Sequence, residues 1–316
     1  MALPIPEPDF PTGPAPNRFV AVETTGIFCR PGCPAPAPRA GNVRPASSAR
    51  EALFSGFRPC LRCRPLESAG PMPTPAELRR AERLRPVLAA ARRARRVRRG
   101  SDAVVLRLLS TPLGPMLAGA TDDGIALLEF ADRPMLPTQL AVLERRLRRP
   151  LVAGRHVLLD RLRAELGEYF GGERGTFDVP LVVAGTPFQE RVWDVLRAIP
   201  TGSTLAYEEL AELAGHPSAM RAAGTANGAN RLALLIPCHR VIRKSGETGN
   251  YGGGRWRKAW LLAHEARLAA ATDLSAPDAR APAGRTVLHT GRGLGANLPI
   301  YQAAHTTNRQ VLRPSL

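Results

Sequence analysis

The stretch LALLIPCHRVIR at residues 232–243 places a lone cysteine, Cys238, directly between a proline and a histidine, His239. Three interpretations are open: Cys238 is a nucleophile, a buried apolar residue or a metal ligand. A free thiol has a pKa of about 8.5 and is only slightly ionised at pH 7, so a nucleophilic role needs a neighbouring base. Free cysteine is often simply apolar filling, and this stretch alone favours that interpretation.

The segments around Cys238 are predicted to be mainly helical. Apolar residues recur at three-to-four spacing over 187–199, 206–215, 218–229 and 255–268. The second and third of these form a helix-turn-helix pattern, with Pro217 near the start of its second helix. Adjacent residues on a helix do not face each other, so His239 would reach Cys238 through a water.

Upstream, the pattern changes to strands. Short apolar runs at 104–110, 115–121 and 125–130 are separated by TPLG and TDDG, and the latter is a hairpin turn signal. Residues 143–149 and 157–170 are predicted to be helices. These patterns indicate an α/β subdomain over 101–182, followed by a mainly helical domain over 183–268.

The charge of the chain indicates a polyanionic partner. Its 316 residues carry 44 basic and 27 acidic side chains, a formal net charge of +17, and Lys244 and Lys258 are the only lysines. This balance favours nucleic acid, although a genome rich in arginine codons would explain part of it. No apolar run approaches the length of about 20 residues that a membrane span needs, and no N-terminal signal segment is recognisable. We therefore expect a soluble intracellular protein without membrane contact.

The remaining segments lack a clear helix or strand periodicity. Residues 1–17 are proline-rich and 269–316 lack periodicity, so we expect both to be disordered. Within a basic linker over 67–100, residues 76–99 carry ten arginines and two acids, with Pro86 in the middle. This predicts two short basic helices or a disordered arm, which either adds salt-sensitive affinity for phosphates or is simply solvated.

The other cysteines form a cluster within residues 18–66. Their spacing is C-x3-C, then 26 residues, then C-x2-C, which fits a tetrahedral zinc site; the ligands are Cys29, Cys33, Cys60 and Cys63. An odd cysteine count in an intracellular chain argues against disulfides and for a metal plus a reactive thiol. On spacing alone, a purely structural zinc is favoured.

The motifs around Cys238 resemble those of the O6-alkylguanine-DNA alkyltransferases. The resemblance is carried by GTPFQERVWDVLRAIPTGSTLAYEELAELAG, SAMRAAGTANGAN, LALLIPCHRVIRKSGETGNYGGG and RKAWLLAHE, in order and spacing over 185–267. It implies a ribonuclease-H-like subdomain over 101–182 and a winged-helix-like DNA-binding domain over 183–268. It also implies that the second helix of the helix-turn-helix enters the minor groove.

The same resemblance implies roles for single residues. Cys238 would accept the alkyl group, His239 would act as the base through a water, and Glu265 would orient it. Tyr207 would help protonate the departing guanine, and Asn230 would fix the turn before the cysteine loop. DNA contacts are expected from an intercalating arginine, a second arginine and the wall of the guanine pocket; these are Arg221, Arg240, Tyr251, Gly252 and Gly253.

The four-cysteine segment resembles the zinc domain of the bacterial adaptive-response methyltransferases (the Ada family). The matching stretches are RFVAVETTGIFCRPGC, NVR and GFRPCLRCRP. The resemblance implies one zinc ion and a methyl acceptor at Cys29, which takes methyl groups from DNA methylphosphotriesters. About 40 residues separate Cys63 from the strands, too few for the AraC-type activator domain that full members of this family carry.

We therefore expect a single-turnover DNA repair methyltransferase of the bacterial cytoplasm. Its partner would be double-stranded DNA with alkylated guanine or methylphosphotriesters; we expect a monomer without a small-molecule cofactor. The alternative is a damage-sensing DNA-binding regulator in which the zinc module is structural or signalling only. A cysteine hydrolase that uses Cys238 and His239 would leave the helix-turn-helix and the basic charge unexplained.

Overall fold

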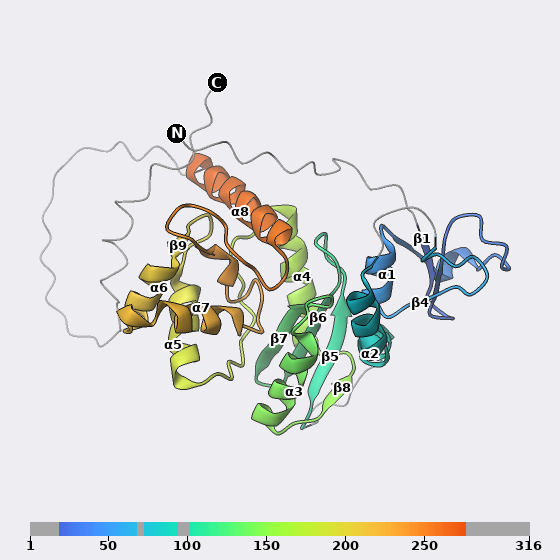
Figure 1. Ribbon diagram of the computed structural model, residues 1–316, viewed down its shortest axis with the longest axis horizontal. Coiled ribbons are helices and arrows are strands. Elements are labelled where there is room, and N and C mark those ends of the chain that lie inside the picture. The colour runs from blue at the N-terminus through green and yellow to red at the C-terminus, as the bar shows by residue number, and fades with distance from the viewer. Residues whose placement is uncertain (1–18, 68–72, 94–101, 276–316) are drawn as a thin grey trace, which may run out of the picture. The chain divides into compact units, whose positions relative to one another are not determined.

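A computed structural model describes residues 19–67, 73–93 and 102–275 (Figure 1). The expectation of disorder for 1–17 and most of that for 269–316 fall outside these ranges. Where the ranges do overlap, Ala269–Ser275 prolong the last helix, so this part of the tail is helical. No helix in these ranges combines the length and the apolar character needed to cross a membrane.

The first described segment is a small sheet with one helix. Strands β1 (Phe19–Val22), β2 (Ile27–Cys29), β3 (Val43–Ala46) and β4 (Arg58–Pro59) pair in the order β3-β1-β2-β4. A short 3-10 turn, η1 (Ala40–Asn42), precedes β3, and helix α1 (Ala49–Phe54) follows it. The Ser48 side chain accepts a hydrogen bond from the Glu51 amide and so caps α1. Phe28, Phe54 and Phe57 fill the core of this module.

The arginine-rich segment forms one helix, α2 (Pro75–Arg92), where the sequence predicted two short helices or a disordered arm. Thr74 and Glu77 make a complete capping box at its start, and Pro75 occupies the first turn, where a proline is tolerated. Pro86 lies on the exposed side of the helix. A buried stripe holds the helix in place despite this proline; its members are Ala81, Leu84, Leu88 and Ala91.

Helix α2 packs on α1 of the small module and on the next sheet, mainly on its strand β5 (Val104–Leu109). One buried apolar cluster therefore contains Phe54 and Phe57, Leu88 of α2, and Val104 and Leu106 of β5. Because all these side chains share one core, α2 is a structural element between the two modules rather than a free linker.

The second sheet contains the three strands predicted from the apolar runs. These are β5, β6 (Met116–Thr121) and β7 (Gly124–Phe130); a fourth, β8 (Leu151–Ala153), pairs parallel to β5, giving the order β7-β6-β5-β8. Both faces are covered, since alternating side chains of β5–β7 enter two different apolar clusters. Helix α3 (Leu136–Leu147) begins earlier than the predicted 143–149, and α4 (Val157–Gly171) matches its prediction closely.

The four helices predicted around Cys238 are confirmed. They are α5 (Pro187–Ala198), α6 (Tyr207–Leu213), α7 (Met220–Gly228) and α8 (Arg255–Ser275), with a 3-10 turn, η2 (Pro217–Ala219), between α6 and α7. Strands β9 (Leu205–Ala206) and β10 (Val241–Ile242) form a short parallel pair. The Trp193 indole donates a hydrogen bond of 2.8 Å to the Ala226 carbonyl and ties α5 to α7. The site loop therefore lies on a fixed set of helices.

The close approach of Gly56 to α2 gives a test of this packing. Gly56 has a φ of +79°, and a Cβ there would lie 2.6 Å from the backbone nitrogen of Ala89. We predict that Gly56→Ala destabilises the contact between α1 and α2 by about 2–4 kcal/mol, through backbone strain plus overpacking. Hydrogen exchange of the α2 amides measures this loss.

Gly215→Ala is the matched control, because Gly215 has a φ of +80° but open space around it. This substitution should cost about 1 kcal/mol from strain alone, without faster exchange in α2. Equal effects of the two substitutions would contradict the packing described for α2.

Candidate active site and metal centre

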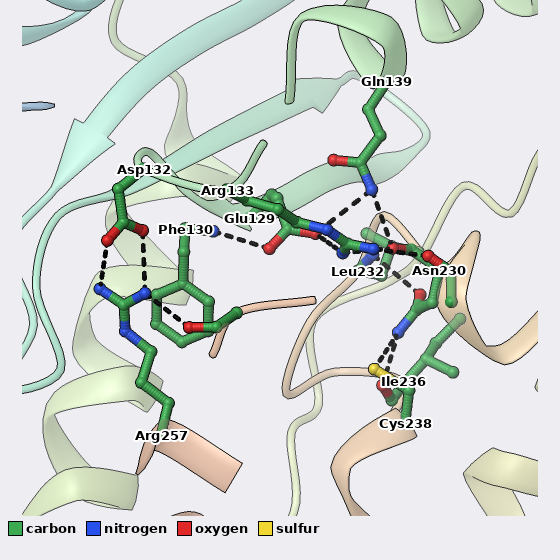
Figure 2. A network of polar contacts seen from close by, with 12 residues as sticks. Glu129, Phe130, Asp132, Arg133, Gln139, Asn230, Leu232, Ile236, Cys238 and Arg257 are labelled. Carbon is green, nitrogen blue, oxygen red and sulfur yellow. Dashed lines mark hydrogen bonds and ion pairs between the residues drawn. The ribbon is translucent and has the colours of Figure 1, made fainter. Parts of the chain in front are cut away.

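Cys238 opens a single 3-10 turn, η3 (Cys238–Arg240), and its side chain is almost fully buried. Its Sγ accepts a hydrogen bond of 3.2 Å from Asn230 Nδ2, which also donates to the Ile236 carbonyl at 2.8 Å (Figure 2). Asn230 Oδ1 accepts from the Leu232 amide at 2.9 Å. One asparagine side chain therefore closes the loop 230–236 and points a donor at the sulfur. The expected closeness of Asn230 and Cys238 is present in the structure.

His239 and Glu265 also come together, although 26 residues separate them. His239 Nε2 lies 2.9 Å from Glu265 Oε1, and both side chains are buried. His239 Nδ1 is buried and has no hydrogen-bond partner within the described residues. A buried ring nitrogen without a partner is costly, and a water is the ordinary way to satisfy it. The geometry thus leaves one imidazole nitrogen available to act as a base.

Arg240 does not have the position expected of a DNA contact. Its guanidinium is buried and donates to Glu265, at 2.7 Å to Oε2 and 2.9 Å to Oε1, and to the Ile199 carbonyl. The reason is electrostatic, since the buried carboxylate of Glu265 needs a cation beside it. The interpretation of Arg240 as a DNA contact was therefore wrong, and its role is to hold Glu265 in place.

The pKa values of these groups follow from burial and from their neighbours. Burial raises the pKa of the Cys238 thiol, while the Asn230 hydrogen bond and the charge of Arg133 act against that rise. Burial lowers the pKa of His239 in spite of the attraction of Glu265. Burial also opposes ionisation of Glu265, but His239 and Arg240 together lower the pKa of this carboxyl far below its ordinary value. At neutral pH, the site therefore holds a thiol, a neutral imidazole and a carboxylate.

The remaining predicted side chains lie near Cys238 or on the surface. Tyr207 begins α6 and is half-buried, and burial raises its pKa. The Tyr251 ring centroid lies 6.5 Å from that of His239, and its hydroxyl is buried without a hydrogen-bond partner in the described part of the chain. Arg221 is exposed on α7. These positions leave Tyr207 and Tyr251 beside the thiol and Arg221 at the surface.

The two predicted pocket glycines pack against protein side chains. A Cβ at Gly252 would lie 2.5 Å from the Arg133 guanidinium carbon, and one at Gly253 would lie 2.6 Å from the Phe130 ring. The sequence suggested that these glycines allow a planar base to approach the backbone. The structure adds a requirement of its own, since Arg133 and Phe130 already occupy the space that a side chain would fill.

The four clustered cysteines converge as the spacing predicted. All four Sγ atoms lie within 4.8 Å of one another, and those of Cys33 and Cys60 are 3.9 Å apart. A tetrahedral zinc with Zn–S bonds of 2.3 Å separates its sulfurs by about 3.8 Å, so the donor set fits this ion. Cys29 ends β2 and Cys60 follows β4; the parallel pairing of β2 and β4 brings the two cysteine pairs together.

Comparisons with known proteins agree with both sites. Residues 187–267 match the model of the 6-O-methylguanine DNA methyltransferase, DNA binding domain, and residues 15–66 match that of the metal binding domain of Ada. The regulatory protein Ada of Salmonella typhimurium is 33% identical over an alignment that covers 80% of this chain and 93% of the relative. The chain belongs to the Ada family. The metal centre is therefore the four-cysteine zinc site of an Ada metal-binding domain.

Two shorter proteins each match about half of this chain. The methylated-DNA–protein-cysteine methyltransferase of Shigella flexneri is 38% identical and covers 52% of this chain and 99% of the relative. The solved structure of the Mycobacterium tuberculosis O6-methylguanine methyltransferase is 37% identical, covers 52% of this chain and 93% of that chain, and has a TM-score of 0.45.

The alignment with the Salmonella protein spans 335 positions, more than the 316 residues of this chain, although it covers only 80% of them. The relative therefore has residues without a counterpart in this chain. In the described part of the interval between Cys63 and β5, the structure has the single helix α2.

Two residues near the site were missed by sequence reasoning. The Tyr169 hydroxyl, on α4, donates to Glu265 Oε1 at 2.8 Å. Lys258, on α8, is fully buried; its Nζ donates to the Val241 carbonyl, and burial lowers its pKa to about 8. A signal for Lys258 was present, since it is one of only two lysines in an arginine-rich chain. Tyr169 gave no comparable signal, because it lies 96 residues from Glu265.

Removal of the charge of Glu265 tests this arrangement. We predict that Glu265→Gln lowers the free energy of unfolding by about 3–5 kcal/mol at pH 7, because Arg240 is then left as an uncompensated buried charge. The folded-state pKa of Glu265 is depressed, so its contribution is present above the ordinary carboxyl pKa of about 4.3 and is lost as the pH falls. The advantage of the wild type over the variant should therefore shrink below about pH 4 in denaturant titrations.

Tyr169→Phe is the control, since it removes one neutral donor from the same carboxylate and leaves the charge pair intact. It should cost about 1–2 kcal/mol, with little dependence on pH. The ion pair would be contradicted if Glu265→Gln lowered the free energy of unfolding by no more than Tyr169→Phe does, and with as little dependence on pH.

Proposed function

We propose that this protein repairs DNA by direct and irreversible transfer of the alkyl group of O6-alkylguanine, and of O4-alkylthymine, to Cys238. A methyl group of DNA methylphosphotriesters is transferred in the same irreversible way to zinc-bound Cys29. The observation that supports transfer to Cys238 is a buried thiol, hydrogen-bonded by Asn230, beside a histidine that Glu265 holds at one nitrogen. The other nitrogen of this histidine has no hydrogen-bond partner among the residues that the structure describes. This arrangement suits activation of a nucleophile.

The transfer at Cys238 uses side chains of this protein and one water. His239 Nδ1 takes the thiol proton through a water, and Glu265 stabilises the imidazolium that forms. The thiolate attacks the alkyl carbon, so that a carbon–sulfur bond forms and the bond from that carbon to O6 breaks. The electron pair of that bond passes to the guanine, which Tyr207 helps to protonate. The thioether has no hydrolytic exit, so each site reacts once.

The burial of Cys238 requires the target base to leave the duplex. An O6-alkyl group lies inside the base stack, out of reach of the sulfur of Cys238, a residue that is only 4% exposed. The small residues of α7 suit close approach to the minor groove, and the exposed Arg221 would fill the gap left by the base. Tyr251 and the backbone of Gly252 and Gly253 would wall the guanine pocket.

The zinc module carries the second transfer. When bound, zinc keeps its cysteine ligands as thiolates at neutral pH, so Cys29 needs no separate base. Cys29 and Cys33 are partly exposed whereas Cys60 and Cys63 are buried, which favours the first pair for reaction with DNA. In the alternative function, the module is structural or signalling only, and the protein acts as a damage sensor.

The finer architecture is part of this proposal. The α/β subdomain over 101–182 would be ribonuclease-H-like and the helical domain over 183–268 winged-helix-like, preceded by a zinc domain over 18–66 and a connecting segment over 67–100. The partner is double-stranded DNA with alkylated guanine or methylphosphotriesters, bound by a monomer in the bacterial cytoplasm without a small-molecule cofactor.

Peptide mass analysis after two separate incubations tests both transfers. Duplex DNA with O6-methylguanine should place one methyl group on Cys238, and DNA with random methylphosphotriesters should place one on Cys29. Cys238→Ser and Cys29→Ser should each abolish only their own signal.

A methyl group on Cys238 alone would reduce the zinc module to a structural or signalling role. DNA binding without any methyl group on Cys238 would overturn the transferase and leave the damage sensor.

A further inference from the structure

A buried polar cluster lies beneath the turn that carries Asn230, and the mechanism above does not use it. It consists of Glu129 at the end of β7, Arg133 in the following connection and Gln139 on α3 (Figure 2). Their exposed fractions are 0%, 6% and 6%. Side chains of these types are almost never buried unless they are paired. The groups that this cluster binds should therefore account for its burial.

The cluster converges on two backbone carbonyls at the end of α7. Arg133 donates to the Gly228 carbonyl and, at 3.2 Å, to the Asn230 carbonyl. Gln139 Nε2 donates to the same Asn230 carbonyl at 3.1 Å. Three donors thus satisfy carbonyls at a helix C-terminus that would otherwise be left without partners, and the positive charge suits the negative end of the helix.

Glu129 holds the donors in position. Its Oε2 pairs with the Arg133 guanidinium and accepts from Gln139 at 3.3 Å, while Oε1 accepts from the Phe130 amide at 2.9 Å. The ion pair of Glu129 and Arg133 lies within the α/β subdomain, but Arg133 also donates hydrogen bonds to backbone carbonyls of the helical domain. A buried pair of this kind contributes little net stability compared with apolar packing, so its position is better explained by what it orients.

Arg133 also touches the second loop that flanks Cys238. A Cβ at Gly252 would lie 2.5 Å from the Arg133 guanidinium, so the arginine packs directly against the backbone of that loop. The turn at 228–230 and the loop at Gly252 therefore rest on one guanidinium from a different domain. Its charge also opposes the rise in the pKa of Cys238 that burial causes.

We propose that Arg133, held by Glu129, is a positioning residue for alkyl transfer. Its hydrogen bonds fix the backbone of Asn230, so that Asn230 Nδ2 stays directed at the Cys238 sulfur. The inference rests on the proposed function and deepens it. It assigns to the α/β subdomain a direct part in the chemistry of the helical domain.

Arg133→Lys separates geometry from charge. Lysine keeps the positive charge but lacks the planar fork that reaches Glu129, Gly228 and Asn230 together. With protein in excess over O6-methylguanine duplex, we expect the transfer rate constant at saturation to fall at least tenfold. The Kd for the same duplex, measured in a Cys238→Ser background, should change less than threefold. Gln139→Met removes one donor to Asn230 and should lower the rate constant in the same direction but less.

The pH dependence of the Cys238 thiol gives a readout without DNA. The midpoint for its reaction with iodoacetamide, followed on the Cys238 peptide, should move to higher pH in Arg133→Lys, because the sulfur loses its fixed donor. The ionisable groups that act on this thiol or pack beside it are Glu129, Arg133, Lys258, Tyr207, Tyr251 and His239. The substitution retains their charges, so a shifted midpoint reports geometry.

Glu165→Gln is the matched control. Glu165 on α4 is also buried and accepts hydrogen bonds from the amides of Asp178 and Val179. Within the described residues, its hydrogen bonds and ion pairs do not involve Cys238 or the 228–230 turn. The Glu165→Gln variant should be less stable than the wild type. Its transfer rate constant and the pH midpoint for reaction of the Cys238 thiol should be unchanged. A wild-type rate constant and midpoint in Arg133→Lys and Gln139→Met would overturn the inference, whereas the lack of transfer by the wild type would overturn the proposed function itself.

Discussion

The buried carboxylate of Glu265 is the interaction on which the site depends. From α8 it binds His239 and Arg240 of the cysteine turn and Tyr169 of α4, and Arg240 extends the contact to the Ile199 carbonyl after α5. One oxygen pair therefore ties together four segments that are distant in sequence. The charge is tolerable only because its partners are charged or are donors, so the same contacts that stabilise it also fix the histidine beside Cys238.

Other parts of the structure hold the loops around Cys238 and join the zinc module to the second sheet. Asn230 donates a hydrogen bond to the sulfur, and Arg133 and Gln139 of the α/β subdomain donate to the turn that carries Asn230. The loop at Gly252 and Gly253 packs on side chains from the same subdomain. On the other face of that sheet, α2 joins the zinc module through a shared apolar core. Arg50 of α1 adds an ion pair of 3.1 Å to Asp132, which also pairs with Arg257 of α8. The zinc module is thus in contact with the alkyltransferase part and is not a loosely tethered domain.

Much of this could be predicted from local pattern. Apolar periodicity located the strands and helices, and cysteine spacing located the metal centre, because each depends on residues close in sequence. Resemblance supplied Glu265 and Asn230, whose closeness to His239 and Cys238 the structure shows. Helix α2 was predicted poorly because Pro86 argues for a break, whereas burial of one stripe outweighs that local cost.

The misassigned and missed residues share a different cause. The resemblance implied a DNA contact at Arg240, but the carboxylate that its guanidinium binds, Glu265, lies 25 residues away. Arg133 and Asn230 are 97 residues apart, and no periodicity or spacing connects them. Buried polar contacts between residues distant in sequence are visible only once the fold brings them together.

The most direct test of irreversible transfer to Cys238 is a count of repaired bases with damaged DNA in excess. O6-methylguanine duplex is mixed with limiting protein, and the loss of the modified base is followed to its end point. We predict that repair stops at one base per protein molecule, and that Cys238→Ser repairs none. Continued repair beyond one equivalent would show that the group leaves the protein again, and would contradict the account.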